Sequence, residues 1–257
     1  MKISVVLITF NEADRLEAAL KSVEGIADEI VVVDSHSTDE TEKIALKHTD
    51  RFFRREWTNY ADQKNYANSK AAFPWILSLD ADERLSPGLR QEILSLKEED
   101  PAASAFSVPR QAYYLGRWIR HSGWYPDRKV RLFRNNNASW EGEFVHESLE
   151  VEGEVKKLQG ILQHFTYRDL SDQLLRVDTY SSLGAQKLYA DQKRCRWHHL
   201  WALPFFSFLR TYVWKAGFLD GQAGFIIAVM QGYGVFARYA KLREIWKKGE
   251  RIEPFPH

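Results

Sequence analysis

Residues 75–83 read Trp75-Ile76-Leu77-Ser78-Leu79-Asp80-Ala81-Asp82-Glu83, an apolar run that ends abruptly in carboxylates. The apolar part predicts a buried β-strand, and the alternation of side chains along an extended backbone would put Asp80 and Asp82 on the same side. Carboxylates that close repel each other unless a cation lies between them, and Mg²⁺ is usually held by one or two carboxylates together with substrate phosphates. The stretch therefore predicts a platform for a divalent cation and a diphosphate. A surface turn rich in aspartate is the alternative interpretation.

The rest of the first hundred residues surrounds this strand with alternating strands and helices. Further apolar runs predict strands at residues 2–8, 29–34 and 51–54, and helical patterns begin near residues 16, 37, 61 and 87. Ser37 and Glu40 fit a capping box, whereas Ser86 and Pro87 supply an N-cap and a proline at the first helical position.

Apolar strands separated by helices predict an α/β fold with a mostly parallel, Rossmann-like sheet and helices on both faces. Ligands of such sheets bind beyond the carboxyl ends of the strands. Residues 9–12, 34–39 and 80–82 all fall there, so we expect the site at this edge.

From about residue 101 the pattern loosens into short strands and turns. We expect further strands, partly antiparallel, that complete the sheet and form the wall of the site on the side where an acceptor would bind. Ser171 is the expected N-cap of a helix that reaches about residue 194, and helical stretches follow at residues 199–215 and 220–248.

Length and composition allow one large domain, or one domain with a C-terminal appendage. The chain has 257 residues, of which 44% are hydrophobic and 14% aromatic, too apolar for a disordered protein. Cys195 is the single cysteine, which excludes an intramolecular disulfide and suits a reducing compartment. Residues 1–8 read as a first core strand rather than a signal peptide, so we expect a cytoplasmic protein.

Charge and aromatic residues are concentrated in the C-terminal part. From Arg196 onward there are nine Lys/Arg against four Asp/Glu, a balance of +5, and 14 of the 35 aromatic residues. This pattern favours an anionic membrane surface over nucleic acid as partner. Residues 197–209 and 221–237 are uncharged, but their proline, glutamines and glycines make them poor membrane spans. We expect peripheral binding at the inner face of the cytoplasmic membrane; helices packed on the body or in a dimer interface are the alternative.

Five further residues could carry chemistry. Displacement at a sugar carbon needs a base, and His146 and Glu147 offer an imidazole and a carboxylate. Asp34 could bind the base or ribose of a nucleotide, and Lys64 could offset diphosphate charge. His164 ends an expected strand and could complete a metal shell. The corresponding alternatives are a cap aspartate for Asp34, a surface lysine for Lys64, a core histidine for His146, a surface residue for Glu147 and a histidine that binds no metal for His164.

These motifs occur together with others in the order and spacing of a known enzyme family. The segments are Ile3–Glu12, Ile30–Thr41, Gln63-Lys64-Asn65, Ile76–Glu83, Tyr125–Phe133, Val145-His146-Glu147 and His164. With them the chain resembles the inverting glycosyltransferases of family 2, which have the GT-A fold. It is similar to the branch that includes bacterial lipopolysaccharide-core β-glucosyltransferases.

The resemblance implies a GT-A catalytic domain over residues 1–168, with a nucleotide-sugar half at 1–100 and an acceptor half at 101–168, and a membrane-associating helical region at 169–257. The implied donor-binding residues are Thr9, Asn11, Glu12, Asp34, Lys64 and Asp80. The implied ligands of Mg²⁺ or Mn²⁺ are Asp80 and Asp82, with His164 as a further candidate.

The resemblance also implies the reaction. A hexose would be transferred with inversion to a lipopolysaccharide-core or other lipid-linked glycan acceptor. The resemblance favours glucose as the hexose and UDP-glucose as its donor. Many relatives carry an E-D pair where this chain has His146-Glu147, so the role of base is carried over to Glu147, with His146 as the second candidate.

Two other functions compete with this one. A sugar nucleotidyltransferase would share the α/β architecture but normally needs a first loop rich in glycine and basic residues, which residues 9–12 lack. A non-catalytic module that binds sugar nucleotides or glycans would not need the carboxylates Asp80, Asp82 and Glu147.

Overall fold

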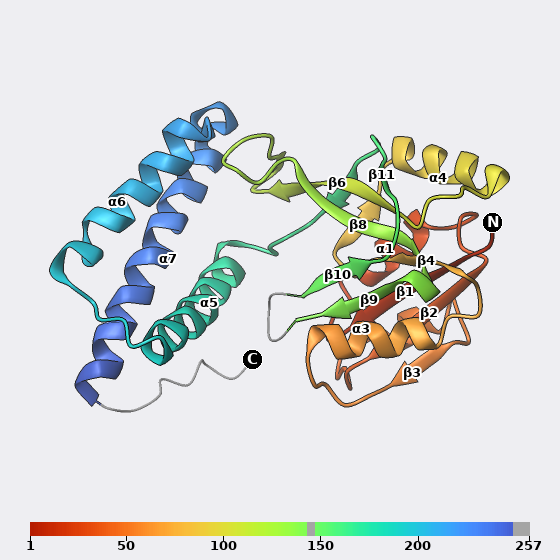
Figure 1. The fold of residues 1–257 in the computed structure, drawn as a ribbon, viewed down its shortest axis with the longest axis horizontal. Helices are drawn as coiled ribbons and strands as arrows, with labels where there is room; N and C mark the ends of the chain where they lie inside the picture. Colours follow the sequence, from red (N-terminus) through yellow and green to blue (C-terminus); the bar gives the residue numbers. More distant parts are fainter. Residues whose placement is uncertain (143–146, 249–257) are drawn as a thin grey trace. The chain divides into compact units, whose positions relative to one another are not determined.

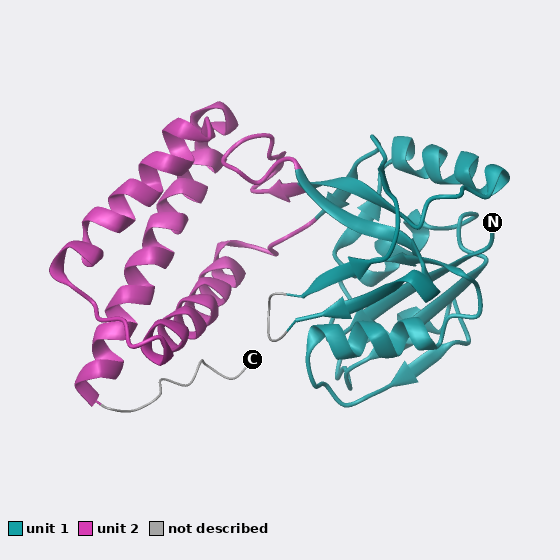
Figure 2. Ribbon diagram, viewed as in Figure 1, with its two compact units in different colours: residues 1–111, 127–164 teal, residues 112–126, 165–257 magenta. Residues whose placement is uncertain are grey.

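The computed structural model describes residues 1–142 and 147–248 of the chain. They fall into two compact units (Figure 2). Unit 1 comprises residues 1–111 and 127–164, and unit 2 comprises residues 112–126 together with those from 165 onward. Residues 112–126 thus group with the C-terminal part of the chain rather than with the strands on either side of them.

Unit 1 is an α/β unit whose sheet begins with four parallel strands (Figure 1). In spatial order they are β3 (Phe52–Arg54), β2 (Glu29–Asp34), β1 (Ile3–Thr9) and β4 (Trp75–Ser78). The helices of this part are α1 (Leu16–Ser22), α2 (Thr41–Ala45), α3 (Tyr60–Ser69) and α4 (Pro87–Glu99). The predicted strands and their parallel arrangement are confirmed.

The remaining strands of unit 1 are mostly antiparallel. The long sheet continues with β8 (Asp127–Arg134), β6 (Ala105–Tyr114), β12 (Leu162–His164) and β5 (Glu83–Leu85), while β11 (Val155–Lys157) pairs with β6 in parallel. After a 3₁₀ turn, η1 (Asn135–Asn137), a separate two-stranded sheet contains β9 (Ala138–Glu141) and β10 (Ser148–Val151). The expected addition of antiparallel strands is confirmed.

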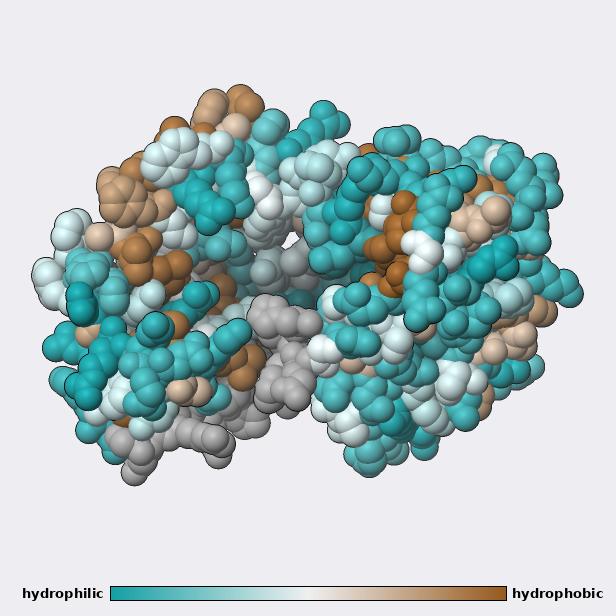
Figure 3. Space-filling model, viewed as in Figure 1, coloured by the Kyte–Doolittle hydropathy of each residue, from teal (hydrophilic) through white to brown (hydrophobic). Residues whose placement is uncertain are grey.

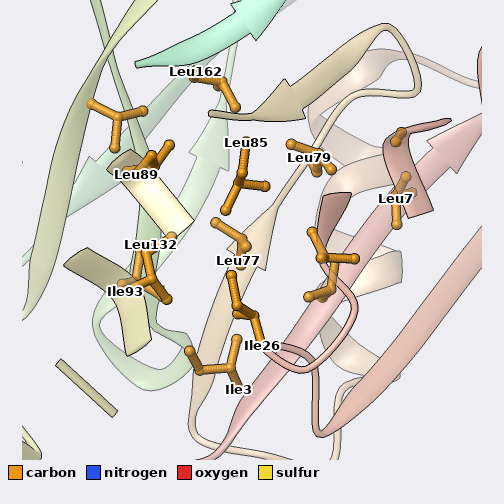
Figure 4. Close-up of a cluster of buried hydrophobic side chains, with 14 of the residues drawn as sticks. Ile3, Leu7, Ile26, Leu77, Leu79, Leu85, Leu89, Ile93, Leu132 and Leu162 are labelled. Carbon is orange, nitrogen blue, oxygen red and sulfur yellow. The ribbon is translucent and has the colours of Figure 1, made fainter. Parts of the chain in front are cut away.

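Side chains of the central strands alternate between two cores. Ile3, Val5 and Leu7 of β1 lie in one buried cluster with residues of α1 and α4 (Figure 4). Val6 lies in the other cluster, together with Ala67 of α3. Because successive side chains of a strand point to opposite faces, the sheet has helices on both faces, as predicted.

One of the three predicted helix caps is present. The hydroxyl of Ser86 accepts a hydrogen bond from the Leu89 N–H (3.2 Å), which caps α4 as expected. The capping box of Ser37 and Glu40 is wrong, because α2 begins at Thr41 and Glu40 makes no side-chain cap bond. Ser37 instead donates its hydroxyl to a carboxylate at the end of β2.

Unit 2 is mainly helical. Its elements are β7 (Arg117–Trp118), α5 (Leu170–Ala190), the 3₁₀ segments η2 (Trp197–Leu200) and η4 (Gly217–Asp220), α6 (Ala202–Leu209), the π-helical η3 (Arg210–Trp214) and α7 (Gly221–Lys248). The predicted cap Ser171 is wrong, because Asp169 accepts the N–H of Asp172 (2.8 Å) and starts α5 earlier.

A buried aspartate anchors residues 112–126 in unit 2. Asp220 is only 1% exposed. Its carboxylate accepts the backbone N–H groups of Arg120 (3.0 Å) and His121 (2.9 Å) and the hydroxyl of Ser122 (3.0 Å). These bonds explain why the segment belongs with the helices, since a buried carboxylate must be satisfied by donors.

Candidate functional site

The carboxyl ends of β1 and β2 hold a buried acidic group. Parallel pairing places Thr9 opposite Asp34. The Asp34 carboxylate is 2% exposed and accepts the hydroxyls of Thr9 (2.8 Å) and Ser37 (2.5 Å) and the N–H of Ser37 (2.7 Å). Two of the predicted donor-binding residues are thus in contact, and three donors fix the position of the carboxylate.

The loop after β1 is tied to the loop after β2. Asn11 has a left-handed backbone (φ 53°), a conformation that asparagine tolerates. Its N–H donates to the Ser37 hydroxyl (2.8 Å), and its side-chain oxygen accepts the N–H of Thr38 (2.9 Å). The Glu12 N–H donates to the Thr41 hydroxyl (2.8 Å). The structure therefore places Asn11 and Glu12 at the predicted edge, beside Asp34.

The chain turns directly after β4. The Glu83 N–H donates to the Asp80 carbonyl (2.9 Å), and the Asp80 N–H donates to the Glu83 carboxylate (3.2 Å). Our prediction that Asp80 and Asp82 continue an extended strand is therefore wrong, and the alternation argument does not apply to them. The two aspartates have different partners.

Asp80 lies between two buried cations. Its carboxylate is 2.5 Å from the Arg131 guanidinium and 3.2 Å from the Lys64 ammonium. Burial alone would raise the pKa of Asp80, but Arg131 and then Lys64 hold it well below its usual value. Arg131 also donates to the fully buried Glu83 (2.6 Å). The negative charge of Asp80 is thus already balanced by protein side chains.

Asp82 contacts a different set of groups. His164 Nε2 lies 3.2 Å from the Asp82 carboxylate, and Arg15 lies 3.7 Å from it. The contact with His164 follows from the sheet, because antiparallel pairing of β12 with β5 places His164 opposite Glu83. Among the described residues no group of three His, Cys, Asp or Glu side chains could hold a metal ion. Of the three predicted metal ligands, Asp82 and His164 are in contact with each other.

Lys64 connects the end of β4 with the candidate base. Its side chain is 5% exposed, so the alternative of a surface lysine is wrong. The ammonium lies 3.2 Å from Asp80, 3.5 Å from Glu147 and 4.4 Å from the centre of the Trp140 ring. Glu147 is thus part of the same charged cluster as Asp80, whereas His146 lies outside the described residues.

Three further charged residues of this cluster were not predicted from the sequence. Arg131 is 4% exposed, Arg15 is 6% exposed and Glu83 is fully buried. Arg131 directly precedes the buried Leu132 and Phe133 of β8, and a charged residue beside buried apolar residues of a strand is a signal for a partner. Nothing near Arg15 in the sequence indicates its contact with Asp82.

Comparison with known proteins finds relatives along most of the chain. The family model for glycosyl transferase family 2 matches residues 4–148. LpsC, a lipopolysaccharide core biosynthesis glycosyltransferase of Rhizobium meliloti, is 31% identical over 254 residues, which cover 93% of this chain and 94% of that protein. An uncharacterized glycosyltransferase of Rickettsia prowazekii, RP128, is 28% identical over 98% of this chain and 90% of its own length.

Among solved structures, a TarS fragment of S. aureus is 14% identical with a TM-score of 0.46, covering 97% of this chain and 92% of that one. The family model spans more than half of the chain, and the α/β fold expected for a GT-A enzyme is the one observed. The chain therefore belongs to glycosyltransferase family 2.

Proposed function

We propose that the chain transfers a hexose, glucose from UDP-glucose, to a lipopolysaccharide-core or other lipid-linked glycan with inversion at the sugar carbon. The observation that carries this proposal is Lys64, which contacts both Asp80 and Glu147. One buried ammonium thus links the strand end where a diphosphate would bind with a carboxylate that can act as a base. Neither rival function needs a base in contact with this edge.

The donor would bind along the carboxyl ends of the parallel strands. Thr9, Asn11, Glu12 and Asp34 lie at the ends of β1 and β2 and would contact the nucleotide. Lys64 would lie near the diphosphate, since it is the cation beside Asp80. Hydrogen bonds already fix these loops, so binding would order few further groups.

A divalent cation fits beside Asp82 better than beside Asp80. Asp80 already balances Arg131 and Lys64, whereas Asp82 and His164 present an oxygen and an imidazole nitrogen 3.2 Å apart. Mg²⁺ prefers oxygen ligands, so the imidazole favours Mn²⁺ of the two predicted cations. Bound there, the cation would stabilise negative charge on the departing diphosphate.

Glu147 would act as the general base. Its carboxylate would take the proton of an acceptor hydroxyl, whose oxygen forms a bond to the anomeric carbon from the face opposite the diphosphate. The bond between that carbon and the diphosphate oxygen breaks, and its electron pair leaves with the diphosphate. A single displacement of this kind converts an α-linked donor into a β-linked product.

Unit 2 would bring the enzyme to a lipid-linked acceptor. Several aromatic side chains after α5 are exposed, among them Trp197, Trp201, Phe205, Phe206 and Trp214. Figure 3 shows hydrophobic patches on the face of this unit that is in view. Patches of this kind favour an interaction surface. No helix among the described residues is long and apolar enough to cross a bilayer.

The charges of this region favour an anionic bilayer as partner. Between residues 197 and 237 the charged residues are Arg210, Lys215 and Asp220. Asp220 is buried and hydrogen-bonded, whereas Arg210 and Lys215 are exposed. The exposed charge next to the aromatic side chains is therefore entirely positive, as expected for a peripheral protein at the inner face of the cytoplasmic membrane. The similarity to LpsC, a lipopolysaccharide core biosynthesis glycosyltransferase, supports a lipopolysaccharide-core acceptor.

Product formation tests the proposal. Purified protein is incubated with radiolabelled UDP-glucose, Mn²⁺ and core-truncated lipopolysaccharide, and the anomeric configuration of the product is read by NMR. A β-linked glucosyl product supports the proposal. Release of pyrophosphate from UTP and a sugar phosphate would identify a nucleotidyltransferase, and donor binding without turnover would identify a binding module.

A further inference from the structure

Three consecutive side chains of α3 reach three different parts of unit 1. Gln63 is fully buried and donates to the Ser35 hydroxyl (3.0 Å), next to Asp34. Lys64 contacts Asp80 and Glu147. Asn65 follows them and is directed to β9. Gln63 and Lys64 contact residues where the donor would bind, whereas Asn65 contacts β9.

Asn65 pairs with a backbone peptide group as a strand would. Its side-chain NH₂ donates to the Trp140 carbonyl (2.8 Å), and the Trp140 N–H donates to the Asn65 side-chain oxygen (2.9 Å). In an antiparallel ladder the N–H and C=O of one residue point the same way, so one amide can satisfy both. Asparagine is suited to this because it carries a donor and an acceptor on one planar group.

Trp140 belongs to the same hairpin as the candidate base. It pairs with Leu149 of β10, and Glu147 immediately precedes the first residue of that strand, Ser148. A two-stranded sheet is marginally stable by itself, so contacts with the rest of the unit decide where it lies. The Trp140 ring also lies over Lys64, with the ammonium 4.4 Å from its centre.

We propose that Asn65 is a positioning residue for transfer. By holding the Trp140 peptide it fixes the β9–β10 hairpin and, through it, the distance of Glu147 from Lys64 and Asp80. This inference rests on the proposed function, because it assigns Asn65 to the placement of the base. It predicts that Asn65 affects turnover without affecting donor affinity.

The test compares Asn65→Ala with a control on the same helix. Asn59 caps α3 by accepting the Asp62 N–H (2.9 Å), so Asn59→Ala weakens the helix without touching Trp140. For both variants and the wild type, kcat and KM, the affinity for UDP-glucose by calorimetry, the melting temperature and the hydrogen exchange of residues 138–149 are measured.

We expect Asn65→Ala to lower kcat at least tenfold, to leave donor affinity within twofold of wild type and to speed exchange of the Trp140 amide at least tenfold. Asn59→Ala should keep kcat within twofold despite a lower melting temperature. Asn65→Asp retains an acceptor for the Trp140 N–H but loses the donor, so its kcat should lie between those of wild type and Asn65→Ala.

The opposite results would overturn the inference. Wild-type kcat in Asn65→Ala, or an equal loss in Asn59→Ala at an equal melting temperature, would show that Asn65 only stabilises the helix. Should Asn65→Ala not fold, unchanged kcat in Asn65→Asp would have the same meaning. A wild-type protein without transfer activity would instead refute the proposed function, and with it the base that Asn65 is said to place.

Discussion

Asp80→Asn removes one negative charge from the buried cluster at nearly constant side-chain size. The Asp80 carboxylate lies 2.5 Å from Arg131 and 3.2 Å from Lys64, and both cationic side chains are about 95% buried. Mutual repulsion of Asp80 and Asp82 would predict that losing one charge stabilises the protein. The contacts predict the reverse, because the variant leaves two buried cations with fewer counter-charges.

The contacts also set the size of the effect. Removing one partner of a buried ion pair costs about 3–5 kcal/mol, and an exposed pair contributes about 0–1 kcal/mol. The Asp80 side chain is 30% exposed, and Arg131 keeps Glu83 at 2.6 Å. We therefore expect the unfolding free energy to fall by about 2 kcal/mol, between these limits.

The effect should depend on pH. The pKa of Asp80, which burial alone would raise, is held below its usual value by Arg131 and Lys64. Because the unfolded chain then binds the proton first, the stabilisation is present above about pH 4 and is lost as the pH falls further. The difference in stability between wild type and Asp80→Asn should thus be complete at pH 7 and smaller at about pH 3.

Urea unfolding at both pH values, followed by tryptophan fluorescence, measures this difference. The control is Asp82→Asn, whose partners His164 and Arg15 lie at 3.2 Å and 3.7 Å and whose loss should cost about 1 kcal/mol or less. The reasoning is refuted if Asp80→Asn is as stable as wild type at pH 7, or no less stable than Asp82→Asn.

Three further predictions concern activity and membrane binding. Glu147→Gln should lower kcat by about 10²-fold or more with unchanged donor affinity, since the amide cannot take a proton; near wild-type turnover would move the role of base elsewhere. His164→Ala should raise the Mn²⁺ concentration for half-maximal activity at least tenfold, and an unchanged Mn²⁺ titration would remove it from the metal set. Serine at Trp201, Phe205 and Phe206 together should weaken sedimentation with anionic vesicles at an unchanged melting temperature; undiminished binding by the folded variant would show that these aromatic residues are not the contact surface.

The parallel strands could be predicted because their signal is local. Residues 29–34 and 75–78 are short apolar runs that a sheet buries on both faces, and each is followed by a helical pattern. Helix caps were harder to predict, because several hydroxyls and carboxylates compete for the same donors. Ser37 lies beside the Asp34 carboxylate, and this tertiary partner prevails over the local capping box.

The contacts within the candidate site could not be predicted from the sequence. Considered within its own helix, Lys64 was better explained as a solvated surface lysine, since its partner Glu147 lies 83 residues away. The turn at Asp80 likewise depends on Glu83 and on Arg131, which is 51 residues distant. Such contacts depend on which strands become neighbours, and no periodicity in the sequence contains that information.

The two aspartates of the 80–82 motif consequently have different chemical roles to offer. Asp80 is neutralised by Arg131 and Lys64, so its charge organises the protein interior. A cation placed against it would compete with two fixed positive groups only a few ångströms away. Asp82 lies 3.7 Å from the Arg15 guanidinium and 3.2 Å from the His164 imidazole, a side chain that commonly ligates metals. If a divalent cation binds with the donor, electrostatics therefore favour Asp82 with His164 as its protein ligands, and Asp80 as the residue that holds Lys64 between the donor and Glu147.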